Sequence, residues 1–306
     1  MVLFWIIIYR TYNKLICIDW LFLSIAAAVI FGISNIINKE VLEKEHSFEF
    51  LSVYYLFNLF IVLPFIKNIN TIDYRILFAI ILRSIFMVMY MTFYTKALKH
   101  MQISVVGPLT NLNPLFVLGA GFLILGELIT SLQILGIVVL LIGSYVLNSD
   151  GHFKNWGAPF KKLFKSKYMS YMIYSGICYV GVSLLAKYIL RDTESFTLLF
   201  YHYIFTTLIY LGITFFIYKG IDDIIEGIKL DGFWIFVSAA IGTLGTYLIY
   251  LAFSNPNSSV GIITAISRIQ VLVGVVFGGR LFHETNIFLK SIASILMLIG
   301  IYLIVI

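Results

Sequence analysis

Apolar runs of about 18 residues or more recur along the whole chain, and each is long enough to cross a bilayer as an α-helix. The chain is 61% hydrophobic and 12% charged, whereas a soluble domain is roughly 45–50% apolar and ~25% charged. Inside lipid every backbone N–H and C=O needs an internal partner, which such runs obtain by forming helices. The sequence therefore predicts an all-α, multi-pass protein of the plasma or inner membrane.

Ten transmembrane helices are predicted from these runs. They cover residues 18–38, 49–66, 76–98, 104–125, 130–147, 169–190, 196–218, 233–253, 259–281 and 287–306. A polar, basic segment divides them five and five. The chain is thereby partitioned into a short N-terminal segment 1–17, a first unit 18–147, a connecting loop 148–168 and a second unit 169–306.

The two units repeat each other. "LLIGSYVL" (140–147) matches "MLIGIYLI" (297–304), with Gly143 and Tyr145 paired to Gly300 and Tyr302 at an offset of 157 residues. Earlier in each unit, Ser104 pairs with Ser259 at an offset of 155. An odd number of spans per unit places the second copy upside down in the membrane. Inverted repeats are typical of secondary transporters, whose substrate site lies near the bilayer midplane between the repeats.

Residues 94–147 resemble the repeat of the EamA family, within the drug/metabolite transporter superfamily. The matching features are Ala97-Leu98 before a short turn, Pro114 within a helix, Gly126-Glu127 at the end of the fourth helix and Gly143 in the fifth. "FGISNIINK" (31–39) is similar to the first-helix pattern of the family, with Phe31 in place of Trp, and includes Asn35.

The second copy keeps Ala252, Glu284 and Gly300, but has Ile269 where the proline would stand. The resemblance implies ten helices around a central cavity and carrier activity. It implies little about the substrate.

The fourth predicted span has an unusual first half, "VGPLTNLNP" (106–114). Pro108 and Pro114 each remove a backbone donor, and Thr110, Asn111 and Asn113 add polar groups within the same two turns. One interpretation is a distorted helix lining a cavity, whose free carbonyls and amides bind substrate. The other is tight helix packing, with the asparagines bonded to neighbouring helices.

Arg268 lies in the matching span of the second unit, nine residues after Ser259, as Asn113 lies nine after Ser104. That depth is ~13 Å at 1.5 Å per residue. An arginine there costs at least ~2.5–3.5 kcal/mol if it faces lipid, so it is expected to face a polar interior. Its fork of donors suits a carboxylate or phosphate. The alternative is a structural arginine bonded to carbonyls of a broken helix.

Five further residues are candidate substrate contacts: Arg83, Tyr90, Tyr94, Tyr247 and His202. Arg83 shares one face of the third span with Met87, Tyr90 and Tyr94, and Tyr247 belongs to a comparable stripe in the eighth. Such stripes also arise from helix packing. His202 stands near one end of the seventh span, where a histidine can titrate near neutrality or simply be hydrogen-bonded.

No Asp or Glu lies deep in any predicted span. Small multidrug exporters of the superfamily depend on an embedded glutamate, so a carrier of zwitterions or anions, such as an amino acid exporter, is favoured. A lipophilic-cation exporter, and a receptor or scaffold on the same fold, remain the alternatives; a solid apolar bundle would indicate the scaffold. Zinc-protease, aspartyl-protease and phosphate-loop motifs are lacking, and the five histidines are scattered. We expect no enzyme activity, metal or cofactor.

The net charge of +6 comes from loops between spans, so it does not indicate nucleic acid as a partner. Residues 154–167 interleave lysines with Trp156, Phe160 and Phe164, a pattern suited to anionic lipid. On the side of the termini we count six Lys and Arg, and on the other side thirteen. The positive-inside rule then places the termini outside, whereas the resemblance implies cytoplasmic termini. Sidedness stays open, as does the choice between monomer and homodimer.

Overall fold

The computed structural model describes residues 20–44, 47–100, 110, 113–148, 167–217, 221–270, 273 and 287–305. All regular structure in these ranges is helical, with no strand among them. The α-helices are α2 (Trp20–Lys44), α3 (Ser47–Val62), α4 (Tyr74–His100), α6 (Asn113–Ala120), α7 (Ser131–Asn148), α9 (Lys167–Ile189), α10 (Ser195–Ile217), α11 (Ile221–Ser254), α12 (Val260–Ile266) and α14 (Ile287–Val305). Each falls, in order, on one predicted span. The predicted segment 1–17 and nearly all of the loop 148–168 lie outside the described residues.

Six helical segments are long and apolar enough to cross a membrane. They are Trp20–Leu42, Phe48–Lys67, Tyr74–Ala97, Met169–Ile189, Ser195–Phe216 and Asp231–Ser254. Three shorter apolar helical segments, Asn113–Leu125, Ser131–Val146 and Ile292–Ile304, accompany them. Large apolar side chains on the outer faces remain uncovered, including Phe78, Leu123 and Phe216. An apolar exterior of this extent needs lipid around it, so the fold is that of an all-helical membrane protein.

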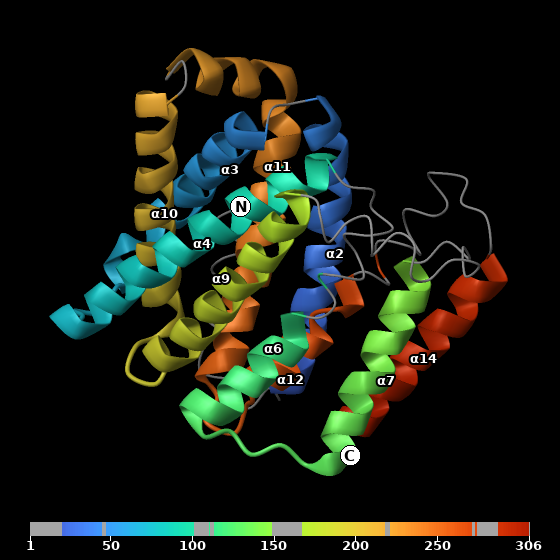
Figure 1. Cartoon of the computed structure of the whole chain (residues 1–306). Coiled ribbons are helices and arrows are strands. Elements are labelled where there is room, and N and C mark those ends of the chain that lie inside the picture. Colours follow the sequence, from blue (N-terminus) through green and yellow to red (C-terminus); the bar gives the residue numbers. More distant parts are fainter. Residues whose placement is uncertain are drawn as a thin grey trace.

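Several helix boundaries differ from those predicted. The helix α11 is longer than 233–253, because it starts at Ile221 and bends at Asp231 (φ −134°, ψ 23°). Its first part lies across one end of the bundle (Figure 1). In the fourth span, α6 is followed by the π-helical turn η2 (Gly121–Leu125), and the helix ends at Gly126. Gly126 has a φ of +67°, a left-handed conformation that glycine adopts without steric cost.

The ninth predicted span is interrupted soon after it starts. The helix α12 has only seven residues, and a turn follows at Ser267 and Arg268. All seven side chains from Val260 to Ile266 are buried. The described part of this span therefore does not form the continuous helix predicted over 259–281.

The largest helix contacts recur when the two halves of the chain are exchanged, whereas several smaller ones, such as α10 with α11, do not recur to the same extent. The most extensive contacts include α4 with α9 and α2 with α11, which are equivalent under this exchange. The contacts of α3 with α11 and of α4 with α10 form a second equivalent pair. The helices α3 with α10, α6 with α12, and α7 with α14 pack against their own counterparts.

The helices α7 and α14 lie side by side at the edge of the bundle and illustrate this exchange (Figure 1). A Cβ on Gly143 would lie 2.8 Å from Met297 Cγ and 2.9 Å from the Ala293 carbonyl oxygen. A Cβ on Gly300 would lie 2.6 Å from the backbone nitrogen of Leu140 and 2.7 Å from the Gly136 carbonyl oxygen. Contact partners thus recur at the same offset of 157 residues found in the sequence. Glycines let these two backbones approach closely, as in other membrane helix pairs.

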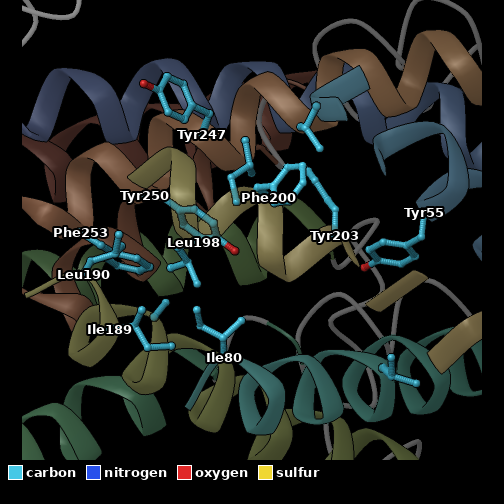
Figure 2. Packing of buried hydrophobic residues seen from close by; sticks show 14 of the residues in the cluster. Tyr55, Ile80, Ile189, Leu190, Leu198, Phe200, Tyr203, Tyr247, Tyr250 and Phe253 are labelled. Atoms are coloured by element: carbon cyan, nitrogen blue, oxygen red, sulfur yellow. The ribbon is translucent and has the colours of Figure 1, made fainter. Parts of the chain in front are cut away.

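The main hydrophobic core lies between α3, α4, α9, α10 and α11. Figure 2 shows Leu198, Phe200 and Tyr203 of α10 near Tyr250 and Phe253 of α11. Aromatic rings fill much of this core; the rings of Tyr55 and Tyr210, for example, stack with centroids 5.1 Å apart. A second cluster joins α2, α7 and α12. These two clusters fix the helices that surround the cavity described next.

Candidate functional site

A central cavity of about 240 Å³ lies between α2, α3, α4, α9, α10, α11 and the segment from α12 to Gln270. Its polar lining residues are Ser34, Asn35, Asn38, Asn58, Arg83, Ser183, His202, Thr246, Thr264, Ser267, Arg268 and Gln270. Its tyrosines are Tyr54, Tyr55, Tyr90, Tyr179, Tyr203 and Tyr250. Five residues predicted from the sequence thus meet in one cavity: Asn35, Arg83, Tyr90, His202 and Arg268.

Arg268 reaches the cavity because α12 ends just before it. The N–H of Arg268 bonds to the Ala265 carbonyl at 3.0 Å, a tighter turn than the helical pattern. Only 6% of the side chain is exposed. Its Nη1 donates to the Thr110 carbonyl at 3.4 Å, which is long for such a bond, and its Nε has no hydrogen-bond partner. Most of the guanidinium's donor capacity is therefore available to a ligand.

The start of α12 is fixed by Glu127 from the other half of the chain. Ser259 Oγ donates to Glu127 Oε2 at 2.7 Å, and the Val260 N–H lies 3.0 Å from both carboxylate oxygens. A carboxylate at a helix N-terminus satisfies free N–H groups and opposes the helix dipole. Glu127 thereby holds the short helix that carries Arg268 at its far end.

Arg83 is the second arginine of the cavity and is only 4% exposed. Its Nη1 lies 2.8 Å from His202 Nδ1, and its guanidinium lies over the Tyr250 ring, 5.1 Å from the centroid. Because arginine is always a donor, Nδ1 of His202 accepts this bond and the imidazole is neutral. The Nε of Arg83 has no hydrogen-bond partner.

The charge of the cavity is one-sided. Arg83 and Arg268 contribute two positive charges, and no Asp or Glu is among the described lining residues. Neither guanidinium forms an ion pair with a carboxylate in the described part of the chain. Burying a cation without a counter-charge is costly, so an anionic group that enters this cavity is electrostatically favoured.

Two matches of one family model cover most of the sequence. The model of the EamA-like transporter family matches residues 18–149 and again residues 166–306. The chain belongs to the EamA-like transporter family.

Two further proteins are similar to this EamA-like chain. An uncharacterised protein of Methanocaldococcus jannaschii is 29% identical over 128 residues, which make up 41% of this chain and 93% of that protein. A protein of known crystal structure has the same fold, with a TM-score of 0.71 and 13% identity, and the match covers 94% of this chain and 98% of that one. Membership of the family identifies the chain as a membrane transporter and makes its central cavity the natural place for a substrate.

Some residues predicted for the site lie outside the cavity of this EamA-like protein. Asn113 instead packs on α9, where a Cβ on Gly176 would lie 3.0 Å from its Oδ1. Tyr94 stacks on Tyr90 at 5.9 Å, and Tyr247 packs edge-on against Phe196. Thr110 contributes the carbonyl that accepts from Arg268.

The two prolines of the fourth span have different outcomes. Pro114 is buried in α6, and Thr110 before it is also helical. That Pro114 distorts this helix stays a prediction. Pro108 and Asn111 fall outside the described residues.

Sequence reasoning missed several lining residues of the EamA-like cavity. Asn58 is fully buried, and its Oδ1 accepts from Thr243 at 2.9 Å while its Nδ2 has no partner. Ser34 bonds to Ser238 at 2.9 Å, and Asn35 donates to Gln270 at 3.3 Å. The available signal was an amide in an otherwise apolar span, "YYLFNLFIV" (54–62), to which the cost argument made for Arg268 applies equally.

A wider pocket of about 890 Å³ lies at one end of the bundle, where α4 and α10 begin and α11 ends. We call this pocket the vestibule. On α11, Leu251 and Ser254 line the vestibule, while Tyr250 and Phe253 line the cavity. Lys187 of α9, 5% exposed, bonds across to α11 and the turn after it. Its Nζ lies 2.9 Å from the Phe253 carbonyl, 2.7 Å from the Asn255 carbonyl and 2.8 Å from Ser258 Oγ. Lys187 therefore joins two of the helices that form both the vestibule and the cavity.

Proposed function

We propose that the chain is a secondary transporter of the cell membrane that moves a small polar metabolite bearing an anionic group, such as an amino acid or a related zwitterion or anion. One observation carries the proposal: two buried arginines, Arg83 and Arg268, line a single central cavity whose described lining holds no acid. A ligand carboxylate or phosphate would supply the missing negative charge through bidentate bonds.

The size of the cavity supports a small substrate. Pockets for drug-sized ligands occupy roughly 300–1,000 Å³, and this one occupies about 240 Å³. A bulky lipophilic cation would need more room and a carboxylate partner. A cavity that holds two arginines also favours a carrier over a scaffold, for which a solid apolar bundle is expected.

Transport by alternating access follows from the proposed arrangement of ten membrane helices in two inverted repeats. The exchange of helix partners between the halves supports this symmetry. A carrier of this kind exposes its central site to each side of the membrane in turn, as one repeat moves against the other. We take export as the working direction, and the transport experiment below measures both.

The proposal is tested by binding and then by transport. Purified protein is screened by thermal shift against amino acids, organic acids, sugars and cationic drugs, because a ligand of the folded state raises the unfolding temperature. The best ligand is then measured in proteoliposomes, in both directions, with wild type, Arg268→Lys and Arg268→Gln.

We expect an anionic or zwitterionic ligand to stabilise the wild type and to be transported. Arg268→Lys, which keeps the charge but loses the fork, should weaken transport, and Arg268→Gln should weaken it further while the protein still folds. Stabilisation by lipophilic cations alone, or normal transport by the Gln variant, would contradict the proposal.

A further inference from the structure

The two arginines serve different levels of the cavity. Arg83 and Tyr90 are seven residues apart on one face of α4, a rise of ~10 Å along the helix. Arg268 interacts electrostatically with Tyr90 and Tyr94. Arg83 does so with Tyr203 and Tyr250, and it bonds to His202. Each guanidinium group therefore has its own surroundings, the Thr110 carbonyl for Arg268 and the His202 imidazole and Tyr250 ring for Arg83.

Each level lacks a negative partner in the described part of the protein. The partners of Arg83 are a neutral imidazole and an aromatic face, and the partner of Arg268 is a carbonyl at 3.4 Å. Both Nε atoms are buried and have no hydrogen-bond partner. A single carboxylate at Arg268 would leave the charge of Arg83 buried and uncompensated, and the reverse also holds.

We propose that the substrate carries two anionic groups, one bound by Arg268 and the other by Arg83, as in a short dicarboxylate or an acidic amino acid. This inference rests on the proposed function and narrows it. The rings of Tyr55, Tyr90 and Tyr179 and the amides Asn35 and Asn58 occupy the lining beside the two charges. They suit a short, partly apolar connector with a few polar substituents.

A monoanionic zwitterion fits this cavity less well. Its ammonium group would share the cavity with at least one unpaired arginine, and no described lining carboxylate would receive it. Repulsion between buried like charges is weakly screened. An acidic amino acid still fits, since its two carboxylates occupy both arginines and its ammonium faces tyrosine rings.

The experiment measures affinities by titration calorimetry on the purified full-length protein. The ligands are straight-chain dicarboxylates of increasing length, the monocarboxylates of the same lengths, and acidic and neutral amino acids. The proteins are wild type, Arg83→Gln, Arg83→Lys and Arg268→Gln. Lys229→Gln removes a positive charge from an exposed site that lines neither pocket, and serves as the matched control.

The expected wild-type result is one preferred dicarboxylate length that binds about tenfold or more tightly than its monocarboxylate, the scale of a charge-assisted pair. Arg83→Gln should abolish this advantage, so that the dicarboxylate and the monocarboxylate bind about equally, and Arg83→Lys should restore part of it. The preference for one dicarboxylate length is measured on the wild type alone. The inference can therefore be tested even if Arg83→Gln folds poorly.

Two results overturn the inference in distinguishable ways. Equal binding of mono- and dicarboxylates by the wild type, with dependence on Arg268, leaves the proposed function standing and makes Arg83 structural. Equal losses for both ligand classes in Arg83→Gln also make Arg83 structural. Failure of every anion to bind, with binding of a cationic or neutral ligand instead, removes the proposed function as well.

Discussion

Glu127 and Ser259 are bonded to each other across the two halves of the chain, with 2.7 Å between Ser259 Oγ and Glu127 Oε2. The same carboxylate binds the Val260 N–H, and Ser259 Oγ also accepts from the Ile262 N–H at 3.4 Å. The first turn of α12 is thus held by an acid that lies 132 residues earlier. This bond links the position of Arg268 to the end of α6 and η2.

We predict that Glu127→Gln lowers the free energy of unfolding by about 1–2 kcal/mol, because it removes a charged cap from α12. Ser259→Ala should cost about the same. The double variant should lose much less than the two losses combined, because both changes remove the same bond. Thermal unfolding of the three variants measures this, and additive losses would show that the two residues act independently.

The glycines of the α7–α14 contact give a second prediction. Gly300→Ala should destabilise the protein by about 1–3 kcal/mol, since its Cβ would meet backbone atoms of α7 that cannot yield. Gly212→Ala in α10 is the matched control, because nothing lies within 4 Å of its Cβ position. A helical glycine replaced by alanine in open space gains about 0.5–1 kcal/mol. Equal unfolding temperatures for the two variants would refute the close contact.

Lys187 gives a prediction about the hydrogen bonds that connect α9 with α11 between the cavity and the vestibule. Lys187→Met should lower the unfolding temperature, because three hydrogen bonds from the ammonium group are lost and each contributes on the order of 1 kcal/mol or more. Lys229→Met, at an exposed site, should leave it unchanged. In proteoliposomes, Lys187→Met should also alter the transport rate, since α9 and α11 separate more easily. A variant as stable as wild type would show that the hydrogen bonds of Lys187 contribute nothing to stability.

Pro114 gives the last prediction. Pro114→Ala should leave the folded protein stable, because alanine keeps its backbone N–H and is a better helix former than proline. If the region before it is distorted for function, transport should fall more than the folded yield does. The comparison is made on one preparation, by size-exclusion chromatography and by uptake into proteoliposomes. Parallel loss of yield and transport would assign the proline to packing alone.

The sequence predicted well those features whose exposure to lipid would be costly. Apolar length located the helices, and the cost of burying a cation in lipid placed Arg268 at a polar interior. Both arguments need only local information, because the surrounding lipid penalises every exposed charge or backbone group alike.

Partners distant in the chain could not be predicted in this way. His202 lies 119 residues from Arg83, and no periodicity within either helix indicates that they meet. The end of α12 at Ile266 was also missed, because "AISRIQVLV" (265–273) contains neither proline nor glycine. The bonds at both ends of α12 come from distant parts of the chain, since Glu127 holds its first turn and the Thr110 carbonyl accepts from Arg268 just after its end.

The exchange-symmetric packing of α7 and α14 has a consequence for charge. If two separate, identical copies of one repeat formed this bundle, any arginine in one copy would recur in the other, and the two would face each other across the axis. With both repeats in one chain, Asn113 occupies the position that matches Arg268. Covalent linkage therefore lets a symmetric framework hold an asymmetric pattern of charge. For the proposed function, this asymmetry predicts that a substrate with two unlike ends binds in one preferred orientation.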